Sequence, residues 1–334
     1  MIASQDSQNR LSFRPSRIGL GTWPLGGPVV LEDESIGRGT IAEAQAIRTV
    51  ETARKCGVTF FDTADIYGLG RSESILGRAL GPTWSSCFVG TKVGKIIRSG
   101  QLVTEFSPAH IQESAEQSLR RLRKDTIDLY QLHNPPLSVV SDARVIECLE
   151  ALRSQGKIRS WGVSARLVSE AVEMIRQGFV GASLQVVFNF VRQEASDTLF
   201  ALAAERGIAV IARVPLEYGV LTGKFTQWTS FPADDHRLAN LQPRLAQELE
   251  HAKALSFLTE AVGGSLTIAA LRFCLSFPEV TTVIPGARTP EQVRENVLAL
   301  ALGALPPSLT ERAREWFRRS HGSQVVQRDL VGKQ

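Results

Sequence analysis

Residues 127–163 read IDLYQLHNPPLSVVSDARVIECLEALRSQGKIRSWGV, and this stretch gives the clearest indication of the fold. The apolar run at 127–133 predicts a buried strand, and apolar residues at helical spacing over 143–154 predict a helix. Gly156 follows as a helix stop signal, and a second apolar run begins at Ile158. The stretch therefore predicts one strand, helix and strand unit of a parallel sheet.

The same alternation runs through the rest of the chain. Strands are expected at 18–20, 59–62, 87–92, 127–133, 158–163, 183–187, 209–214 and 280–284. Helices are expected at 41–55, 72–80, 107–123, 143–154, 168–177, 194–205, 267–276, 290–299 and 309–319. Ser107 before Pro108, and Thr289 before Pro290, are signals for a helix start. This alternation predicts an α/β protein of the (β/α)8 TIM barrel class.

The chain of 334 residues fits one such barrel domain over 1–334, with its core at about 15–320. The alternative, a doubly wound sheet, needs a glycine fingerprint after its first strand, and GLGTWP at 19–24 lacks the third glycine. One segment breaks the alternation: 225–255, after the seventh strand, is expected to be a long loop or lid. Its second half, 241–255, has a composition that also allows a helix, and an extra helix is expected at the C-terminus.

Composition is ordinary for a globular protein, with 43% hydrophobic and 22% charged residues, a net charge of +4 and a sequence pI near 9.0. The basic cluster at 120–124 falls at a helix end, where cations are favourable, so we expect a solvated helix face and no nucleic-acid partner. Four widely spaced cysteines indicate free thiols. The polar segment 1–14 lacks the apolar core of a signal peptide, and no apolar run is long enough to span a bilayer. These features predict a cytoplasmic protein with no membrane partner.

Four polar residues fall at or just after the ends of consecutive strands. Asp62, Lys92 and His133 close the second, third and fourth strands, and Tyr67 follows the second strand by five residues. Because neighbouring strands lie about 4.8 Å apart, these side chains are expected to converge at the barrel mouth. Each residue alone is better explained by a structural role, as an ion pair, a turn cap or a packing aromatic. Their joint placement favours a catalytic site.

The expected chemistry is proton donation to a carbonyl oxygen. An ammonium beside Tyr67 is expected to lower its pKa, while Asp62 holds Lys92 in place and charged. His133 is expected to hold the carbonyl oxygen near Tyr67 or to share its proton. No side chain here supplies a hydride to the carbonyl carbon, whereas a nicotinamide cofactor would.

Two other parts of the sequence contain residue types that are common in functional sites. The run of Asp234, Asp235 and His236 contains metal-ligand types, but two adjacent acids and a histidine in a mobile loop are better explained as solvated lid residues, so no metal site is expected. Trp23, after the first strand, is expected to line the mouth beside Tyr67 rather than to pack in the core.

The chain resembles the aldo-keto reductase family over residues 18–299. The resemblance is carried by IGLGTW at 18–23, FDTADIYG at 61–68, SLRRL at 118–122, IDLYQLH at 127–133, GVS at 162–164, Gln185, Pro215 and Leu216, GVLTGK at 219–224, IPGAR at 284–288, and Glu295 with Asn296. It implies a (β/α)8 barrel that uses NADPH to reduce aldehydes or ketones of a small molecule, reversibly, by hydride transfer from nicotinamide C4.

The resemblance also implies roles for individual residues. Asp62, Tyr67, Lys92 and His133 match the catalytic tetrad, with Tyr67 as general acid and with Trp23, Tyr67 and His133 facing the substrate. Positions that match cofactor contacts are Gly21, Thr22, Trp23, Asp62, Ser164, Gln185, Arg213, Pro215, Leu216, Leu221, Gly223, Lys224, Gly286, Ala287, Arg288, Gln292, Glu295 and Asn296.

This sequence departs from the family pattern at several of these positions. Ala165 stands where the family usually has an asparagine that binds the nicotinamide amide, and Arg213 stands where an aromatic usually stacks on the ring. Arg213 can stack through its flat guanidinium or can reach an anionic substrate group. The loop 219–224 is not a Walker motif and is expected to pass over the pyrophosphate, with a glycine-rich turn that leads into the lid as the alternative. Arg288 remains as a cation for a 2′-phosphate, which favours NADPH over NADH.

Two other functions remain open at this point. One is a cofactor-binding regulatory subunit of the same fold with little turnover, and the other is a barrel lyase or isomerase that works through an enolate. The expected partner is a small carbonyl substrate, and the expected assembly is a monomer or a weak homo-oligomer.

Overall fold

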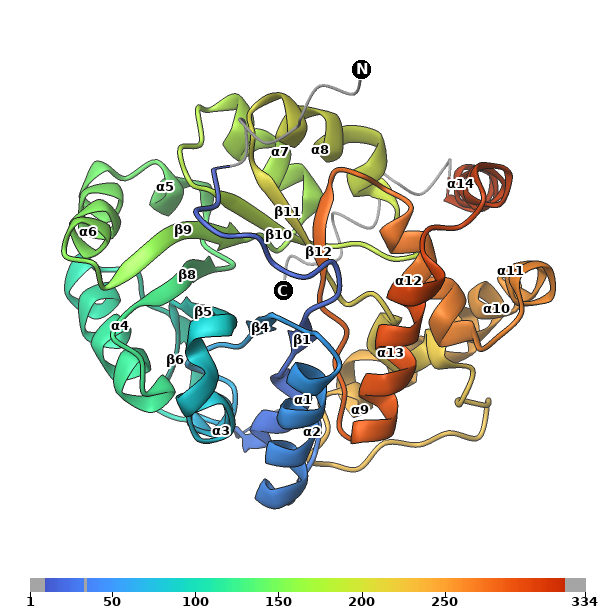
Figure 1. Cartoon of the computed structure of the whole chain (residues 1–334), viewed down its shortest axis with the longest axis horizontal. Coiled ribbons are helices and arrows are strands. Elements are labelled where there is room, and N and C mark those ends of the chain that lie inside the picture. The colour runs from blue at the N-terminus through green and yellow to red at the C-terminus, as the bar shows by residue number, and fades with distance from the viewer. Residues whose placement is uncertain (1–9, 33–34, 322–334) are drawn as a thin grey trace.

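Eight strands, each parallel to its neighbours, form the centre of the molecule (Figure 1). The structure is a computed structural model that describes residues 10–32 and 35–321. In order around the sheet the strands are β1 (Leu20–Gly21), β4 (Phe60–Asp62), β5 (Phe88–Val93), β8 (Ile127–His133), β9 (Ile158–Ser164), β10 (Ser183–Val187), β11 (Ala209–Arg213) and β12 (Val280–Val283). Each lies within two residues of its expected bounds.

The sheet closes on itself because the first strand lies between β4 and β12. The Gly19 N–H donates to the Val283 carbonyl at 2.8 Å, and the Gly21 N–H donates to the Pro285 carbonyl at 3.0 Å. A Cβ atom at Gly19 would lie 2.8 Å from the Phe60 carbonyl oxygen, so glycine permits this close approach. The predicted (β/α)8 barrel is confirmed.

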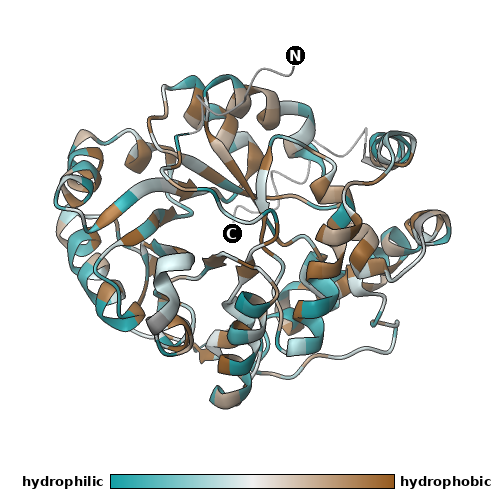
Figure 2. Ribbon diagram, viewed as in Figure 1, coloured by the Kyte–Doolittle hydropathy of each residue, from teal (hydrophilic) through white to brown (hydrophobic). Residues whose placement is uncertain are grey.

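Helices surround the barrel and follow the strands along the chain. They are α2 (Glu43–Lys55), α3 (Arg71–Leu80), α4 (Pro108–Leu122), α6 (Ala143–Ser154), α7 (Val168–Arg176), α8 (Glu194–Glu205), α12 (Leu266–Leu275) and α13 (Pro290–Leu302), with α14 (Pro307–His321) as the expected extra helix. The expected caps form: Ser107 Oγ accepts from the His110 N–H at 3.4 Å, and Thr289 Oγ1 accepts from the Gln292 N–H at 3.3 Å. Hydrophobic and hydrophilic stripes alternate on these helices (Figure 2), as expected for helices packed on a barrel.

The end of the barrel where the strands begin is closed by the segment 10–17, which crosses it (Figure 1). Leu11 and Phe13 are buried there, and the Phe13 ring stacks on the Phe88 ring with centroids 4.6 Å apart. Arg10 anchors the segment through a 3.3 Å hydrogen bond to the Gly181 carbonyl, just before β10. The opposite end is therefore the one available for ligands. Residues 1–9 of the polar N-terminal segment lie outside the described residues.

Several short elements in the connections between strands and helices were not expected from the sequence. Two antiparallel hairpins, β2 with β3 (Val29–Val30 and Ser35–Ile36) and β6 with β7 (Lys95–Arg98 and Gln101–Thr104), pair within themselves and not with the barrel. The others are α1 (Trp23–Gly26), η2 (Gly81–Ser86), α5 (Leu137–Val140) and η3 (Glu217–Thr222). Local apolar runs this short lack the periodicity on which the sequence analysis depends.

The segment expected as a long loop at 225–255 is irregular only in its first part. From Arg237 onward it forms α9 (Arg237–Asn240), η4 (Gln242–Arg244), α10 (Leu245–Lys253) and α11 (Ser256–Val262). The buried side chains of Leu241, Leu245 and Leu255 hold these elements against the barrel. The prediction of a continuous loop was therefore wrong for this half, and the helical alternative was right.

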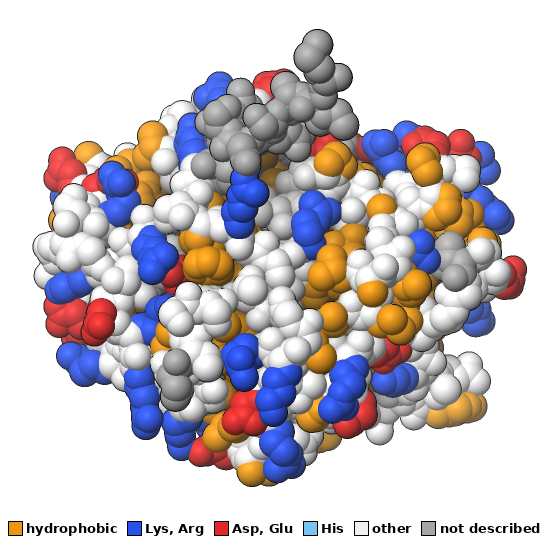
Figure 3. Space-filling model, viewed as in Figure 1, with side chains coloured by type: hydrophobic (Ala, Val, Ile, Leu, Met, Phe, Trp, Pro, Cys, Tyr) orange, Lys and Arg blue, Asp and Glu red, His pale blue; other side chains and the backbone are white. Residues whose placement is uncertain are grey.

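The basic cluster at the end of α4 has structural partners. Arg121 forms an ion pair with buried Glu73 at 2.6 Å, and Lys124 forms one with Asp128 at 3.1 Å. On the face drawn in Figure 3, basic side chains are spread among acidic and apolar ones. Within the described residues, no single helix has the length and apolarity needed to cross a membrane, although the bent pair of 237–261 with α12, at 86°, meets that test together.

Candidate active site

A cavity of about 580 Å³ opens at the end of the barrel where the strands finish. Most of the residues that the sequence predicted for the site line it: Gly21, Trp23, Asp62, Tyr67, His133, Ser164, Gln185, Arg213, Pro215, Leu216, Lys224, Gly286, Ala287, Arg288, Gln292, Glu295 and Asn296. Ligand sites of TIM barrels lie at this end because the strand-to-helix loops converge there.

Four predicted residues do not line the cavity in this structure. Lys92 lies in the wall, fully buried behind the cavity surface. Thr22 is also fully buried, and its hydroxyl donates to the Asp62 carbonyl at 2.9 Å. Leu221 packs in the core, and Gly223 ends η3 with a φ of 71°. Thr22 and Leu221 therefore support the wall of the cavity, and the expectation that Thr22, Leu221 and Gly223 contact a cofactor stays a prediction.

Two members of the predicted tetrad, Asp62 and Tyr67, contact the ammonium group of a third, Lys92. Lys92 Nζ donates to Asp62 Oδ2 at 2.6 Å, to the Thr63 carbonyl at 2.7 Å and to Tyr67 Oη at 3.2 Å. These contacts use all three hydrogens of the ammonium, so Lys92 is fixed in one orientation. The His133 ring lies 6.0 Å from the Tyr67 ring, centroid to centroid, at an angle of 83°.

The second oxygen of Asp62 is held by amides from the barrel interior. Gln185 Nε2 donates to Asp62 Oδ1 at 2.7 Å, and Gln131 Nε2 approaches the same oxygen at 3.4 Å. Ser164 Oγ donates to Gln185 Oε1 at 3.3 Å. The Gln131 contact was missed because a glutamine inside an apolar strand carries no motif. Asp62 is thus a fully hydrogen-bonded, buried carboxylate that balances the charge of Lys92.

The pKa of Tyr67 is shifted in the direction opposite to the expectation. Burial raises the pKa of Tyr67, and the charge of Lys92 offsets that rise only in part. Tyr67 therefore remains a protonated phenol at neutral pH. Burial, together with the charges of Lys92, Lys95 and Arg213, lowers the pKa of His133 well below its ordinary value, so His133 is a neutral imidazole.

Apolar and aromatic side chains surround these polar groups. The Trp23 ring lies 6.1 Å from the Tyr67 ring and 4.3 Å from the His236 ring, centroid to centroid. Trp23 lines the cavity, so its expected place at the mouth is confirmed. Ile36 and Leu102, from the two unexpected hairpins, complete this part of the wall.

Several cavity residues carry buried polar atoms that have no hydrogen-bond partner within the described chain. They are Arg38 Nε, His133 Nδ1, Asn134 Oδ1, Arg213 Nε and Thr267 Oγ1. Arg213 Nη2 donates to the Ala165 carbonyl at 3.0 Å, which fixes its guanidinium in the cavity wall. Because unpaired buried polar atoms are costly, this set indicates a surface shaped for a polar ligand.

The loop after β11 has an unusual backbone where it borders the cavity. Val214, Glu217 and Tyr218 have φ values of 56°, 40° and 54°, and Gly219 has 106°. Non-glycine residues, and a β-branched one above all, rarely adopt positive φ, so this loop is strained unless its surroundings hold it.

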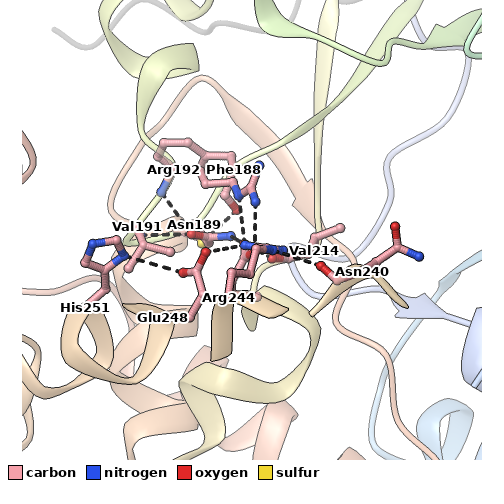
Figure 4. A network of polar contacts seen from close by, with 11 residues as sticks. Phe188, Asn189, Val191, Arg192, Val214, Asn240, Arg244, Glu248 and His251 are labelled. Carbon is pink, nitrogen blue, oxygen red and sulfur yellow. Dashed lines mark hydrogen bonds and ion pairs between the residues drawn. The ribbon is translucent and has the colours of Figure 1, made fainter. Parts of the chain in front are cut away.

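A buried ionic network supplies that hold (Figure 4). The carboxylate of Glu217, with no exposed side-chain surface, pairs with Arg192 at 3.1 Å and with Arg244 at 3.2 Å. Asn189 Nδ2 donates to Glu217 Oε2 at 2.8 Å, and Arg244 also pairs with Glu248. The network therefore joins the loop after β11 to the end of β10 and to helix α10.

A second set of contacts bridges the mouth between segment 37–40 and the predicted lid. The His236 N–H donates to the Gly37 carbonyl at 3.1 Å, and the Thr40 N–H donates to Asp234 Oδ2 at 3.2 Å. Arg288 donates to carbonyls of the same segment, including that of Thr40 at 2.5 Å. Asp234 and His236 thus join two loops. Because Asp235 and His236 are buried, the expectation that this run is solvated was wrong for these two residues.

The adenosine end of the predicted cofactor site is formed by the start of α13. Lys224 Nζ lies 3.9 Å from Glu295 Oε2, and Ser265 Oγ donates to Glu295 Oε1 at 2.6 Å. Gln292 Oε1 accepts from the backbone N–H of Arg288 at 2.7 Å. The structure brings these predicted residues together along one wall.

The sequence analysis missed cavity residues that come from the mouth hairpins and the lid, among them Arg38, Lys95 and Arg237. A signal for one hairpin was present. Ser99 and Gly100 have φ values of 51° and 73°, the positive pair of a tight hairpin turn, and a Ser-Gly pair is a turn signal.

Asp65, in the same motif as Asp62 and Tyr67, yields a prediction about stability. Burial and the nearby charge of Glu73 raise the pKa of Asp65 to about 8, and its Oδ1 has no partner. The folded state then holds a proton that the unfolded chain has lost, so the free energy of unfolding falls as pH rises from about 4 to 8, by up to about 1.4 kcal/mol per pH unit.

We therefore expect Asp65→Asn to remove this loss. The variant should gain stability over the natural protein between pH 5.5 and pH 8.5, as measured by urea unfolding. Because the two proteins share all other titratable groups, the difference between their free energies of unfolding at each pH reports on Asp65. An identical pH dependence in the two would contradict the prediction.

The known proteins that this chain resembles agree with the architecture described above. The sequence model of the Aldo/keto reductase family matches residues 17–315. The aldo-keto reductase YhdN of Bacillus subtilis is 33% identical over 285 residues, which cover 83% of each chain. The NADH-specific methylglyoxal reductase of Escherichia coli is 29% identical, over 85% of this chain and 90% of that protein.

Among solved structures, the glycerol dehydrogenase AKR11B4 from Gluconobacter oxydans superposes with a TM-score of 0.76. It shares 28% sequence identity and covers 95% of this chain and 96% of its own. The family match spans the barrel strands, the tetrad positions and the loop that borders the cavity. The chain belongs to the aldo/keto reductase family of oxidoreductases.

Proposed function

We propose that this protein is a reductase of small aldehydes or ketones that uses a nicotinamide cofactor, NADPH in preference to NADH, and works reversibly. The observation that carries the proposal is the contact of Tyr67 Oη with the fixed Lys92 ammonium at 3.2 Å, at the wall of the cavity. We propose further that one barrel domain accounts for the whole chain and that its partner is a small molecule.

The cavity is suited to a dinucleotide by its charge and its unpaired atoms. Burial and the charge of Arg237 lower the pKa of Arg38 to about 9, a cost that an anionic ligand would relieve. Ser164, Gln185 and Arg213 would hold the nicotinamide end, and Lys224 with loop 219–223 would hold the phosphates. Arg288, Gln292, Glu295 and Asn296 would hold the adenosine end.

The proposed chemistry follows from the protonation states. When bound, a nicotinamide cofactor supplies the hydride for the carbonyl carbon. Tyr67, a phenol at neutral pH, donates its proton to the carbonyl oxygen. The Lys92 ammonium stabilises the phenolate that remains, and Asp62 keeps Lys92 oriented. His133, as a neutral imidazole, carries one N–H that can donate to the same oxygen.

Steady-state cofactor oxidation tests this function. The purified chain should oxidise NADPH in the presence of at least one carbonyl compound from a panel of sugars, pyridoxal, quinones and simple aldehydes. Tight NADPH binding without turnover on any of them would favour the regulatory-subunit alternative. Exchange of substrate protons without cofactor consumption would favour a lyase or isomerase.

Cofactor preference gives a second prediction. The Escherichia coli relative is named for NADH, so the preference has to be argued from this chain, in which Arg288 is the proposed partner of the 2′-phosphate. We expect Arg288→Gln to raise the Kd for NADPH by about 10-fold and the Kd for NADH much less, because a charged hydrogen bond is lost only with NADPH.

Fluorescence titration of both cofactors measures this difference. Arg288 also bonds to carbonyls of segment 38–40. An equal loss of affinity for the two cofactors would mean that Arg288 acts only by holding that segment.

A further inference from the structure

Lys95 is a cavity residue that the proposed chemistry does not use. It begins β6, two residues after the end of β5, and it lines the cavity together with Leu102 from the opposite strand of the hairpin. The turn before it requires glycine: Gly94 has a φ of 112°, and a Cβ there would lie 1.9 Å from the Phe106 ring. The backbone thus places Lys95 at the rim of the barrel by a fixed local geometry.

The Lys95 ammonium lacks an acidic partner within residues 10–32 and 35–321. Its side chain is half-buried, and the neighbouring charge that acts on it most is that of another cation, Arg166. Lys92 offers a clear contrast, because its three donors all have partners. An unpaired, partly desolvated cation that faces a cavity is costly to keep, and an anionic ligand would offset that cost.

The cavity as a whole carries excess positive charge. Its acidic lining residues are Asp62 and Glu295. Its basic lining residues are Arg38, Lys95, Arg213, Lys224, Arg237 and Arg288. Asp62 is already matched by Lys92, and Glu295 lies beside Lys224. Arg237 is paired with Asp235 at 2.6 Å. Within the described residues, the positive charge of the lining that is available to anions therefore comes from Arg38, Lys95, Arg213 and Arg288.

The proposed cofactor phosphates account for only part of this surplus. Lys224 and Arg288 belong to the loops after β11 and β12, whereas Lys95 belongs to the loop after β5. Lys95 follows β5, and β5 pairs with β8, the strand that ends at His133, the residue that is proposed to hold the carbonyl oxygen. In agreement with this placement, the charge of Lys95 contributes to lowering the pKa of His133. Its charge is thus at the end of the cavity where the carbonyl is proposed to react.

We propose that Lys95 binds a carboxylate or phosphate group of the substrate, so that the preferred substrates are short aldehydes or ketones that carry an anion. This inference rests on the proposed reductase function for its chemistry. Ile36, Ile66 and Leu102 give the same cavity an apolar wall, which suits a short carbon chain between the carbonyl and the anion.

The experiment compares charged and neutral substrates of matched length. One pair is 4-oxobutanoate and butanal, and the other is glyceraldehyde 3-phosphate and glyceraldehyde, so that the two pairs distinguish a carboxylate from a phosphate. For the natural protein, kcat/KM should be higher for the charged member of at least one pair. In Lys95→Gln that ratio should fall about 10- to 100-fold, mainly through KM, because a charged contact is lost.

Two further variants make the result specific. Lys95→Arg keeps the charge and should retain most of the preference. Lys55→Gln removes the same charge from an exposed position at the end of α2, outside the cavity lining, and should leave the ratio unchanged. A ratio of one or less in the natural protein, or an unchanged ratio in Lys95→Gln, would overturn the proposal for Lys95 while leaving reductase activity established.

A binding measurement separates this proposal from the function on which it rests. Succinate, which has no carbonyl to reduce, is titrated calorimetrically into the natural protein and into Lys95→Gln, with and without NADP+. Binding that is lost in the variant supports the anion site even if no aldehyde is reduced, in which case only the reductase function fails. Equal binding to both proteins, or none to either, overturns the anion site.

Discussion

Tyr67→Phe is expected to abolish turnover while the variant keeps its fold and its affinity for the cofactor. The phenylalanine ring preserves the packing against Trp23 and His133, so only the hydroxyl that touches Lys92 is lost. Loss of a general acid typically lowers the rate by about 10²- to 10⁴-fold. The measurement is kcat in the reductive direction, together with the Kd for NADPH.

The pH dependence of the natural protein provides a second check on Tyr67. Because burial raises its pKa above the ordinary value near 10, Tyr67 should stay protonated through the neutral range. Reduction should then be insensitive to this group between pH 6 and 9, whereas alcohol oxidation, which needs the phenolate, should accelerate as pH rises. Turnover by Tyr67→Phe close to that of the natural protein would refute the mechanism.

Glu217→Gln is expected to cause a large loss of stability. The change removes one charge that holds two arginines, Arg192 and Arg244, and leaves them facing each other across a buried amide. Breaking a buried ion pair costs about 3–5 kcal/mol, and because both arginines are partly exposed we expect about 2–4 kcal/mol here. Urea unfolding at pH 7 measures this loss.

The same substitution should weaken cofactor binding. Glu217 is itself at positive φ, next to Tyr218 and Gly219, so release of its carboxylate allows the loop to relax out of the cavity wall. Glu250→Gln is a matched control, because Glu250 pairs with Lys253 on the exposed side of α10 and should change stability by less than about 0.5 kcal/mol. Equal effects of the two substitutions would show that the network does not support the loop.

The barrel was predictable because its elements carry strong, repeated patterns. The bounds of β8, α6 and α8 coincide with those expected from the sequence. In each case an apolar run or stripe ends at a glycine or a polar turn, so local preference and burial agree. The candidate site was predictable for the same reason: residues that close consecutive parallel strands have to meet at one end of the barrel.

The rest depended on contacts that no local pattern encodes. Lys95 and Arg38 are brought to the cavity by hairpins two to four residues long on each side, too short to show a period. Glu217 looks like a surface glutamate in sequence, and only the arrival of Arg192 and Arg244 from distant segments explains its burial. The direction of the Tyr67 pKa shift was wrong because desolvation, which outweighs Lys92, cannot be judged from sequence.

The hairpin of β6 and β7 pairs only with itself and joins the barrel through Gly94, so its sequence can change in evolution separately from that of the barrel strands. The groups proposed for proton transfer are fixed by strands β4, β5 and β8, whereas the group proposed to select the substrate is on a separate appendage. Exchange of that appendage can redirect the enzyme to another class of metabolite without a change in the reacting groups. Substrate preference and catalysis can thus change independently of one another during the evolution of this protein.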